Sequence, residues 1–207
     1  MRMQPDINKR DKMANANRPK ILLSLHGFHS SPASLKAQQM RDHLLSNHPD
    51  IQFYCPQLPA LPEQMWQVIE TFFEQHKEYE IAIMGSSLGG FLATKVVQKY
   101  SVKALLINPA VTPNLLFEKY QGPQLHPYLQ QQYEINQDYI KQIENLYIEK
   151  LKYPDKIWVL LQQEDEVLDY RDALQKYKAC KITCEKGGDH SFIGFDRYLT
   201  EIIHFLF

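Results

Sequence analysis

The sequence has few cysteines and no paired cysteine motif. Cys55, Cys180 and Cys184 are odd in number, and the closest two lack the CxxC spacing of a redox or zinc site. This pattern argues against a disulfide framework and predicts buried free thiols, as expected for a reducing cytoplasm. We therefore expect a cytoplasmic location.

Long hydrophobic runs are also absent. No segment approaches the roughly eighteen uninterrupted apolar residues that a membrane span requires. The first stretch, MRMQPDINKRDKMANANRPK, is polar and basic, and it lacks the apolar core of a secretory signal. We expect a flexible leader over residues 1–19 and no stable membrane association.

Neither sign of charge is in excess. Lysine and arginine number 23 and aspartate and glutamate 24, which gives a formal net charge of −1. Proteins that bind nucleic acid usually carry a basic surface, so no nucleic-acid partner is expected, and small-molecule substrates fit better. A length of 207 residues suits one domain, here 20–207, and leaves the oligomeric state open.

Short apolar runs alternate along the chain with longer stretches of helical periodicity. Alternation of this kind predicts a mostly parallel sheet of about six strands flanked by helices, which is an α/β fold. The runs are rich in apolar or β-branched residues throughout, as strands covered on both faces should be. The predicted strands are 21–26, 52–55, 81–85, 104–108, 157–162 and 181–185.

The segments between these runs are amphipathic. Serine or aspartate followed by a helical pattern, or proline at a first helical position, marks a helix start. Helix starts are predicted at Ser31-Pro32, near Pro62, directly after Ser87, after Asp169 and near Phe195.

The connection 111–155, between the fourth and fifth strands, is unusually long. Connections of this length tend to be functional. Ile140, Ile143, Tyr147 and Leu151 suggest one helix in it, preceded by the irregular piece TPNLLFEKYQGPQLHPY. We interpret the connection as a small cap over the carboxyl edge of the sheet. The alternative is a solvated excursion with one extra packing helix.

The stretch GSSLG at 85–89 lies between a predicted strand and a predicted helix. A nucleophile elbow needs a strained central serine at such a turn, with a glycine two residues before and after it. This spacing makes Ser87 the candidate nucleophile and Ser86 the variable position. The Leu88 amide would point toward a developing oxyanion at the start of the helix.

A serine nucleophile requires a general base, and that base requires an orienting acid. His190, in the loop GGDHSF after the last strand, is the candidate base. Asp165, in the loop after the fifth strand, is the candidate acid. Glu164 and Glu166 flank Asp165 as competitors for this role, whereas Asp169 is better explained as a helix cap. The chain order serine, acid, histidine is that of an α/β-hydrolase.

The loop LHGFHSSP after the first strand is the candidate source of a second oxyanion amide, at Phe28. His26 and His29 could also be read as metal ligands, but no carboxylate pattern lies beside them. A structural imidazole that bonds the loop backbone is the favoured reading of His26. We predict no metal and no organic cofactor.

Taken together, LHGF.SSP, GSSLGG, INPAV.P, EDEVLDY and GGDHSF resemble the small bacterial YqiA-like esterases of the α/β-hydrolase superfamily. The matching segments span roughly residues 21–206. The resemblance implies a compact α/β-hydrolase fold and hydrolysis of carboxylic esters or thioesters. It implies the same residues at the site: Ser87, Asp165, His190, and the amides of Phe28 and Leu88. The leader and the segment between Pro113 and Asn136 depart from the pattern.

The leading hypothesis is a serine esterase that acts on small to medium acyl esters or thioesters through an acyl-enzyme. An α/β-hydrolase fold can also serve a non-catalytic binding protein, because fold alone does not determine function. A third reading is acyl transfer to an acceptor other than water, or a thioesterase specialisation.

Overall fold

The computed structural model describes residues 18–207. The predicted leader therefore lies almost wholly outside the described residues. Its last two positions contact residues 77–80. The Arg18 side chain donates hydrogen bonds to the carbonyls of Lys77 and Glu78, and the Pro19 carbonyl accepts one from the Glu80 amide at 2.9 Å.

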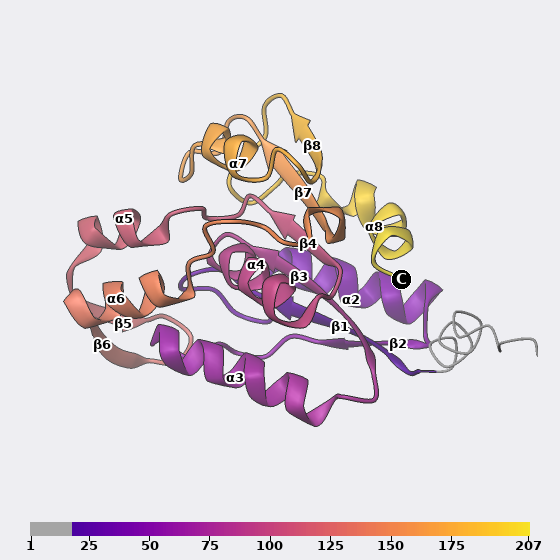
Figure 1. Ribbon diagram of the computed structural model, residues 1–207, viewed down its shortest axis with the longest axis horizontal. Helices are drawn as coiled ribbons and strands as arrows, with labels where there is room; N and C mark the ends of the chain where they lie inside the picture. Colours follow the sequence, from indigo (N-terminus) through magenta and orange to yellow (C-terminus); the bar gives the residue numbers. More distant parts are fainter. Residues whose placement is uncertain (1–17) are drawn as a thin grey trace, which may run out of the picture.

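Six parallel strands form the central sheet, in the order β2-β1-β3-β4-β7-β8 (Figure 1). This confirms the predicted six-stranded α/β arrangement, with boundaries within one residue of those expected. The strands are β1 Lys20–Leu25, β2 Ile51–Tyr54, β3 Glu80–Ser86, β4 Ala104–Ile107, β7 Ile157–Gln162 and β8 Lys181–Glu185.

Helices cover both faces of this sheet. They are α2 Leu35–Asn47, α3 Pro62–Gln75, α4 Leu88–Tyr100, α7 Tyr170–Lys176 and α8 Leu199–Leu206, with short 3-10 turns η2 Pro154–Lys156 and η3 Phe195–Tyr198. Side chains alternate along a strand, so neighbouring residues enter different cores. Leu22 packs in the core with α2 and α8, whereas Leu23 packs in the core with α3 and α4.

The first predicted helix start is wrong. α2 begins at Leu35, with Ser34 as its N-cap residue, and not at Ser31-Pro32. The Ser31 hydroxyl instead accepts a hydrogen bond from the Ala33 amide at 3.2 Å. Such a local turn competes with helix formation, which explains the later start. The starts at Pro62 and after Asp169 are confirmed.

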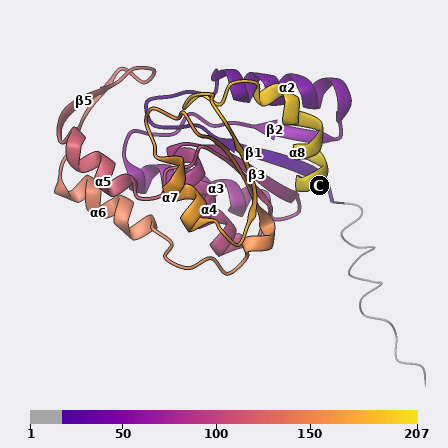
Figure 2. The ribbon, with the colours of Figure 1, turned by 90° about the horizontal axis from the view of Figure 1, so that it is seen from above.

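The long connection contains more structure than expected. It forms α5 Pro113–Phe117, η1 Glu118–Tyr120, an antiparallel hairpin of β5 Gly122–His126 and β6 Gln131–Ile135, and α6 Gln137–Leu146. α5, η1 and β5 occupy the piece that was predicted to be irregular, and the hairpin projects from the body of the molecule (Figure 2). Its strands are half-exposed and mostly polar, so they lack the apolar runs that revealed the other strands.

The predicted cap helix is shorter than its apolar pattern. α6 ends at Leu146, and Tyr147 is already extended, so Leu151 lies outside the helix. The Lys176 ammonium donates to the carbonyls of Ile148 and Glu149, just beyond the end of the helix. A contact from α7, far along the sequence, thus stabilises the extended chain that follows α6.

The structure also bears on the predictions about the cysteines and about membrane spans. The three cysteines are free and half-buried, which makes them more accessible than predicted. None of the helices in residues 18–207 is both long and apolar enough to cross a membrane.

Candidate active site

Ser87 lies at the junction of β3 and α4, which confirms the predicted strand-to-helix turn. Its backbone has a positive φ, with φ 56° and ψ −120°. The turn is fixed from both sides, because the Ser87 amide donates to the Ile107 carbonyl at 3.0 Å and the Ser87 carbonyl accepts from the Ala110 amide at 3.1 Å. Strain of this kind persists only where the surroundings enforce it.

Glycines are required on both sides of Ser87. A Cβ on Gly89 would lie 2.0 Å from the Leu25 carbonyl oxygen, and one on Gly85 would lie 2.2 Å from the Gly89 carbonyl oxygen. Both contacts are with backbone, which cannot rotate away. The two glycines of the GxSxG pattern therefore allow the helix start to approach β1 closely.

His190 and Asp165 meet at the same edge of the sheet. The His190 Nδ1 atom lies 2.8 Å and 2.9 Å from the two Asp165 carboxylate oxygens. Only 2% of the Asp165 side chain is exposed, against 21% for His190. Because a carboxylate only accepts hydrogen bonds, Nδ1 carries the proton and Nε2 is left as an acceptor.

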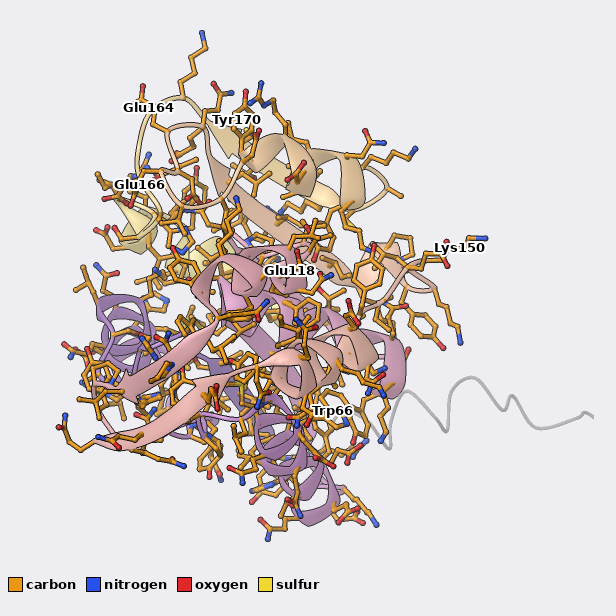
Figure 3. All side chains as sticks on the ribbon, turned by 90° about the vertical axis from the view of Figure 1, so that its left-hand side faces the viewer. Trp66, Glu118, Lys150, Glu164, Glu166 and Tyr170 are labelled. Atoms are coloured by element: carbon orange, nitrogen blue, oxygen red, sulfur yellow. The ribbon has the colours of Figure 1, made fainter. Side chains whose placement is uncertain are left out.

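The neighbouring carboxylates have different partners. The Glu166 carboxylate accepts a hydrogen bond from the His190 backbone amide at 3.0 Å. Asp169 caps α7 by accepting from the Arg171 amide at 2.9 Å, as predicted. Glu164 is exposed, at the outside of this loop (Figure 3). Of these carboxylates, Asp165 is the one that contacts the imidazole.

Two buried amide side chains anchor the loop of His190. The Asn108 side chain donates to the carbonyls of Asp189 and His190 at 2.9 Å and 3.1 Å. The Gln162 side chain accepts from the amides of Asp189 and Ile193 at 3.1 Å and 2.9 Å and donates to the Ile193 carbonyl at 2.8 Å. Sequence reasoning missed both roles, although a polar residue at the end of a wholly buried apolar strand was an available signal.

α2 supplies a further anchor. The Lys36 ammonium donates to the Ser191 carbonyl at 2.7 Å. Burial lowers the pKa of Lys36, whereas the charges of Asp189 and Asp165 act to raise it. The loop of His190 is thus held from β4, β7 and α2.

Ser87 and His190 both attach to the end of β4. Ser87 bonds the Ile107 carbonyl, and the next residue, Asn108, bonds the His190 carbonyl. Within residues 18–207, no direct hydrogen bond joins the Ser87 hydroxyl to His190. Such bonds are often long in the absence of substrate.

The two candidate oxyanion residues line one small cavity. Phe28 and Leu88 contribute to its wall, together with Gly27. A Cβ on Gly27 would lie 3.2 Å from the Ser87 Cβ and 3.7 Å from its Oγ, so this loop runs directly beside Ser87. In the described part of the chain, the backbone amides of Phe28 and Leu88 make no hydrogen bond to the protein. Both are therefore available as donors.

His26 has the structural role that was favoured. Its Nε2 atom accepts from the Leu58 amide at 3.0 Å, which leaves the Nδ1 proton to donate to the Gly27 carbonyl at 2.9 Å. His29 instead makes a 2.7 Å hydrogen bond with the Tyr133 hydroxyl. Among the described residues, no group of three histidine, cysteine, aspartate or glutamate side chains is arranged to hold a metal ion.

The sequence of this chain matches the model of a known protein family. It matches residues 21–207 and is described as "Uncharacterised protein family (UPF0227)". The chain belongs to this family. The match covers both arms of the site, from the Phe28 loop to the His190 loop, and it agrees with the YqiA-like resemblance seen in the sequence.

Solved structures show the fold of this UPF0227 member. Est1E from Butyrivibrio proteoclasticus is similar with a TM-score of 0.67 at 15% identity, over 91% of this chain and 87% of that one. Mouse alpha/beta hydrolase domain-containing protein 10 has a TM-score of 0.70 at 14% identity, over 89% and 88%. Pyrococcus furiosus esterase Pf2001 has a TM-score of 0.62 at 13% identity, over 93% and 82%. The chain has the α/β-hydrolase fold.

Residues with strained backbone conformations in this UPF0227 chain lie mostly around the candidate site. Six non-glycine residues among 18–207 have positive φ, and four of them lie in the loops just described: His29, Ser87, Asn108 and Phe192. Such conformations cluster at functional sites. The positions of these four residues therefore indicate a functional site at this edge of the sheet, without reference to any sequence motif.

A larger cavity lies elsewhere. It encloses about 650 Å³ at the amino edge of the sheet and is lined by Arg18, Tyr79, Lys103 and Lys156 among others. Ligands of open α/β sheets bind at the carboxyl ends of the strands, which is the opposite edge. We therefore place the candidate active site by its chemistry and not by cavity size.

Proposed function

We propose that this protein is a serine esterase that hydrolyses carboxylic esters or thioesters through an acyl-enzyme. The observation that carries the proposal is the contact of His190 Nδ1 with the buried Asp165 carboxylate at 2.8 Å, at the same edge of the sheet as the strained Ser87. The free cysteines support a cytoplasmic setting for this activity.

In the proposed reaction, Ser87 Oγ attacks the carbonyl carbon while His190 Nε2 takes the hydroxyl proton. Asp165 keeps the proton on Nδ1 and stabilises the imidazolium. The amides of Phe28 and Leu88 donate hydrogen bonds to the oxyanion. As the tetrahedral species collapses, His190 gives its proton to the departing alcohol or thiol. Water then attacks the acyl-enzyme by the same route.

The fold comparisons support this reading, since Est1E has also been solved with ferulic acid bound and Pf2001 is an esterase. A binding protein of this fold would not need an aligned acid and base beside a strained serine. The two free amides beside Ser87 are further support, because an oxyanion is the group they would serve.

Ser87→Ala should lower kcat by about a million-fold, because the remaining groups cannot form the acyl-enzyme. Hydrolysis of p-nitrophenyl acetate by purified protein checks this, with the neighbouring Ser86→Ala as the matched control. A fluorophosphonate should label the wild type and Ser86→Ala but not Ser87→Ala. Turnover by a folded Ser87→Ala protein would contradict the proposal.

A further inference from the structure

The side chain of Phe28 packs against the long connection between β4 and β7. Its ring stacks on the neighbouring His29 ring at 3.9 Å and meets the Phe117 ring of α5 edge to face at 5.0 Å. The backbone amide of Phe28 is a candidate oxyanion donor beside Ser87. A contact on the Phe28 ring can therefore affect the position of a group that acts on the reacting carbonyl.

Five aromatic rings form a closed circuit around this contact. The Phe117 ring lies 5.1 Å from the Tyr139 ring of α6, edge to face. The Tyr139 ring lies 6.1 Å from the Tyr133 ring of β6, and the Tyr133 hydroxyl makes the 2.7 Å hydrogen bond with His29. The His29 ring stacks on Phe28, which completes the circuit. Rings at such separations attract one another, so each ring is restrained from two sides.

The long connection supplies the rigid part of this circuit. Phe117 and Tyr139 are 2% and 1% exposed, and they belong to the core that α3 and α4 form with the sheet. α6 is also attached to α3, because the Glu63 amide donates a hydrogen bond to the Gln142 side chain at 3.2 Å. Rings buried in a close-packed core cannot shift without disturbing their neighbours. The Phe28 loop therefore rests on a fixed support.

The Phe28 loop needs such a support. His29 has a positive φ of 51°, and a conformation of this kind persists only where the surroundings enforce it. Burial lowers the pKa of His29 and raises the pKa of Tyr133 to about 12, so both groups are neutral near pH 7 and the hydroxyl can donate to the imidazole. Tyr133 also lines the small cavity of about 10 Å³ whose wall contains Phe28 and Leu88. The contact thus lies beside the candidate oxyanion site.

We propose that Tyr133 and Phe117 are positioning residues that hold the Phe28 amide in place to bind the oxyanion. Tyr133 acts through His29, and Phe117 acts directly on the Phe28 ring. The inference rests on the proposed esterase function and gives the connection 111–155 a part in it. Because the oxyanion exists only in the tetrahedral species, a displaced amide should lower kcat and leave KM nearly unchanged.

The first test removes single contacts on the Phe28 loop. With p-nitrophenyl acetate, Tyr133→Phe should lower kcat by about tenfold and change KM by less than about twofold, since loss of a whole oxyanion donor costs about 100- to 1,000-fold and this donor is only displaced. Phe117→Leu keeps an apolar side chain but loses the ring contact, and it should act in the same way. Tyr128→Phe, at a tyrosine 59% exposed between β5 and β6, is the matched control and should keep the wild-type kcat.

A second measurement separates positioning from a loss of folded protein. Titration with a fluorophosphonate counts the reactive Ser87 residues, so that kcat is expressed per active site. Hexyl trifluoromethyl ketone forms a tetrahedral adduct with a nucleophilic serine, and the oxygen of this adduct carries the charge that oxyanion amides bind. Its inhibition constant should rise by about tenfold in Tyr133→Phe, in step with the fall in kcat. A structural role alone would lower the number of titrated sites and leave the inhibition constant unchanged.

The path through His29 has its own test. His29→Phe retains a ring to stack on Phe28 but loses the hydrogen bond to Tyr133. If Tyr133 acts through this bond, kcat of the double variant with Tyr133→Phe should lie within about twofold of the slower single variant. Effects that multiply in the double variant would overturn the role given to Tyr133.

The outcomes distinguish this inference from the proposed function. If no turnover depends on Ser87, the proposed esterase function fails. If such turnover exists but Tyr133→Phe and Phe117→Leu both keep the wild-type kcat per active site and the wild-type inhibition constant, the esterase function stands and the positioning role is overturned. Phe117→Leu keeps the test decisive if Tyr133→Phe does not fold.

Discussion

At the scale of single residues, Gln162 connects the core of the sheet to the candidate base. It is the last residue of β7 and only 2% exposed, and it bonds the backbone on both sides of His190. A Cβ on Gly188 would lie 2.0 Å from the Gln162 Oε1 atom, so the loop packs directly on this amide. The position of the His190 side chain therefore depends on Gln162, which is not itself one of the candidate catalytic residues.

Gln162→Met should lower kcat about tenfold or more with little change in KM, because imprecise placement of a catalytic group costs rate and not binding. It should also cost about 1–3 kcal/mol of stability, since loop amides lose a buried partner. Steady-state kinetics and urea denaturation check both effects. Gln163→Met, at the exposed next position, is the matched control. Unchanged kcat in Gln162→Met would contradict the anchoring role.

At the scale of elements, the hairpin of β5 and β6 meets the Phe28 loop through histidines. His126 of β5 is buried, and its Nδ1 atom accepts from the amides of Tyr128 and Leu129 at 3.3 Å and 3.2 Å. The His29 and His126 rings lie 5.5 Å apart, edge to face. Burial lowers the pKa of both, and the Coulombic effect of His126 lowers that of His29 further.

This arrangement predicts a loss of stability in mild acid. Unfolded histidines take up protons near pH 6.5, whereas the folded imidazoles of His29 and His126 do so only at lower pH. The unfolded state binds more protons in this range, so the free energy of unfolding decreases as the pH falls through about 6.5. Urea denaturation at about pH 8 and about pH 5.5 measures the change.

A variant pair tests the source of that effect. His126→Asn retains a hydrogen-bond acceptor but cannot be protonated, so its stability should depend less on pH than that of the wild type. His204→Asn, on the exposed side of α8, should keep the wild-type dependence. Equal pH dependence in His126→Asn and wild type would show that the hairpin contributes nothing to it.

At the scale of the whole molecule, one sheet separates two cores. Leu160 of β7 is fully buried with α8, and Leu92 of α4 is fully buried on the opposite face. The same strands contribute alternate residues to both cores. If one core unfolds, one face of the sheet is exposed to water, and the other core packs on that same sheet. The two cores should therefore unfold together.

Leu160→Ala and Leu92→Ala should each cost about 2–5 kcal/mol, because each leaves a buried cavity. Since the two residues belong to different cores, the costs should add to within about 0.5 kcal/mol in the double variant. Leu45→Ala, at a position 69% exposed on α2, should change stability by less than about 0.5 kcal/mol. Two separate urea transitions would contradict a shared sheet.

Local sequence was sufficient for the strands and for the elbow. Strands covered on both faces read as apolar runs, and the glycines around Ser87 mark a turn whose backbone admits no side chain. The hairpin of β5 and β6 was not predictable in this way, because its half-exposed, mostly polar strands carry no clear period-two signal. The end of α6 was not predictable either, because the apolar helical pattern continues to Leu151, beyond the last helical residue, Leu146.

The sequence by itself determined the fold class and the position of Ser87 at a strand end, and it made His190 and Asp165 the candidate base and acid. Tertiary structure decided which carboxylate faces the imidazole, which amides anchor the His190 loop, and how little space remains between Tyr133 and the Phe28 loop. The reason is physical. Hydrophobic periodicity and turn-forming residues depend on a few neighbouring positions, whereas these hydrogen bonds and the wall of the cavity involve residues far apart in the chain.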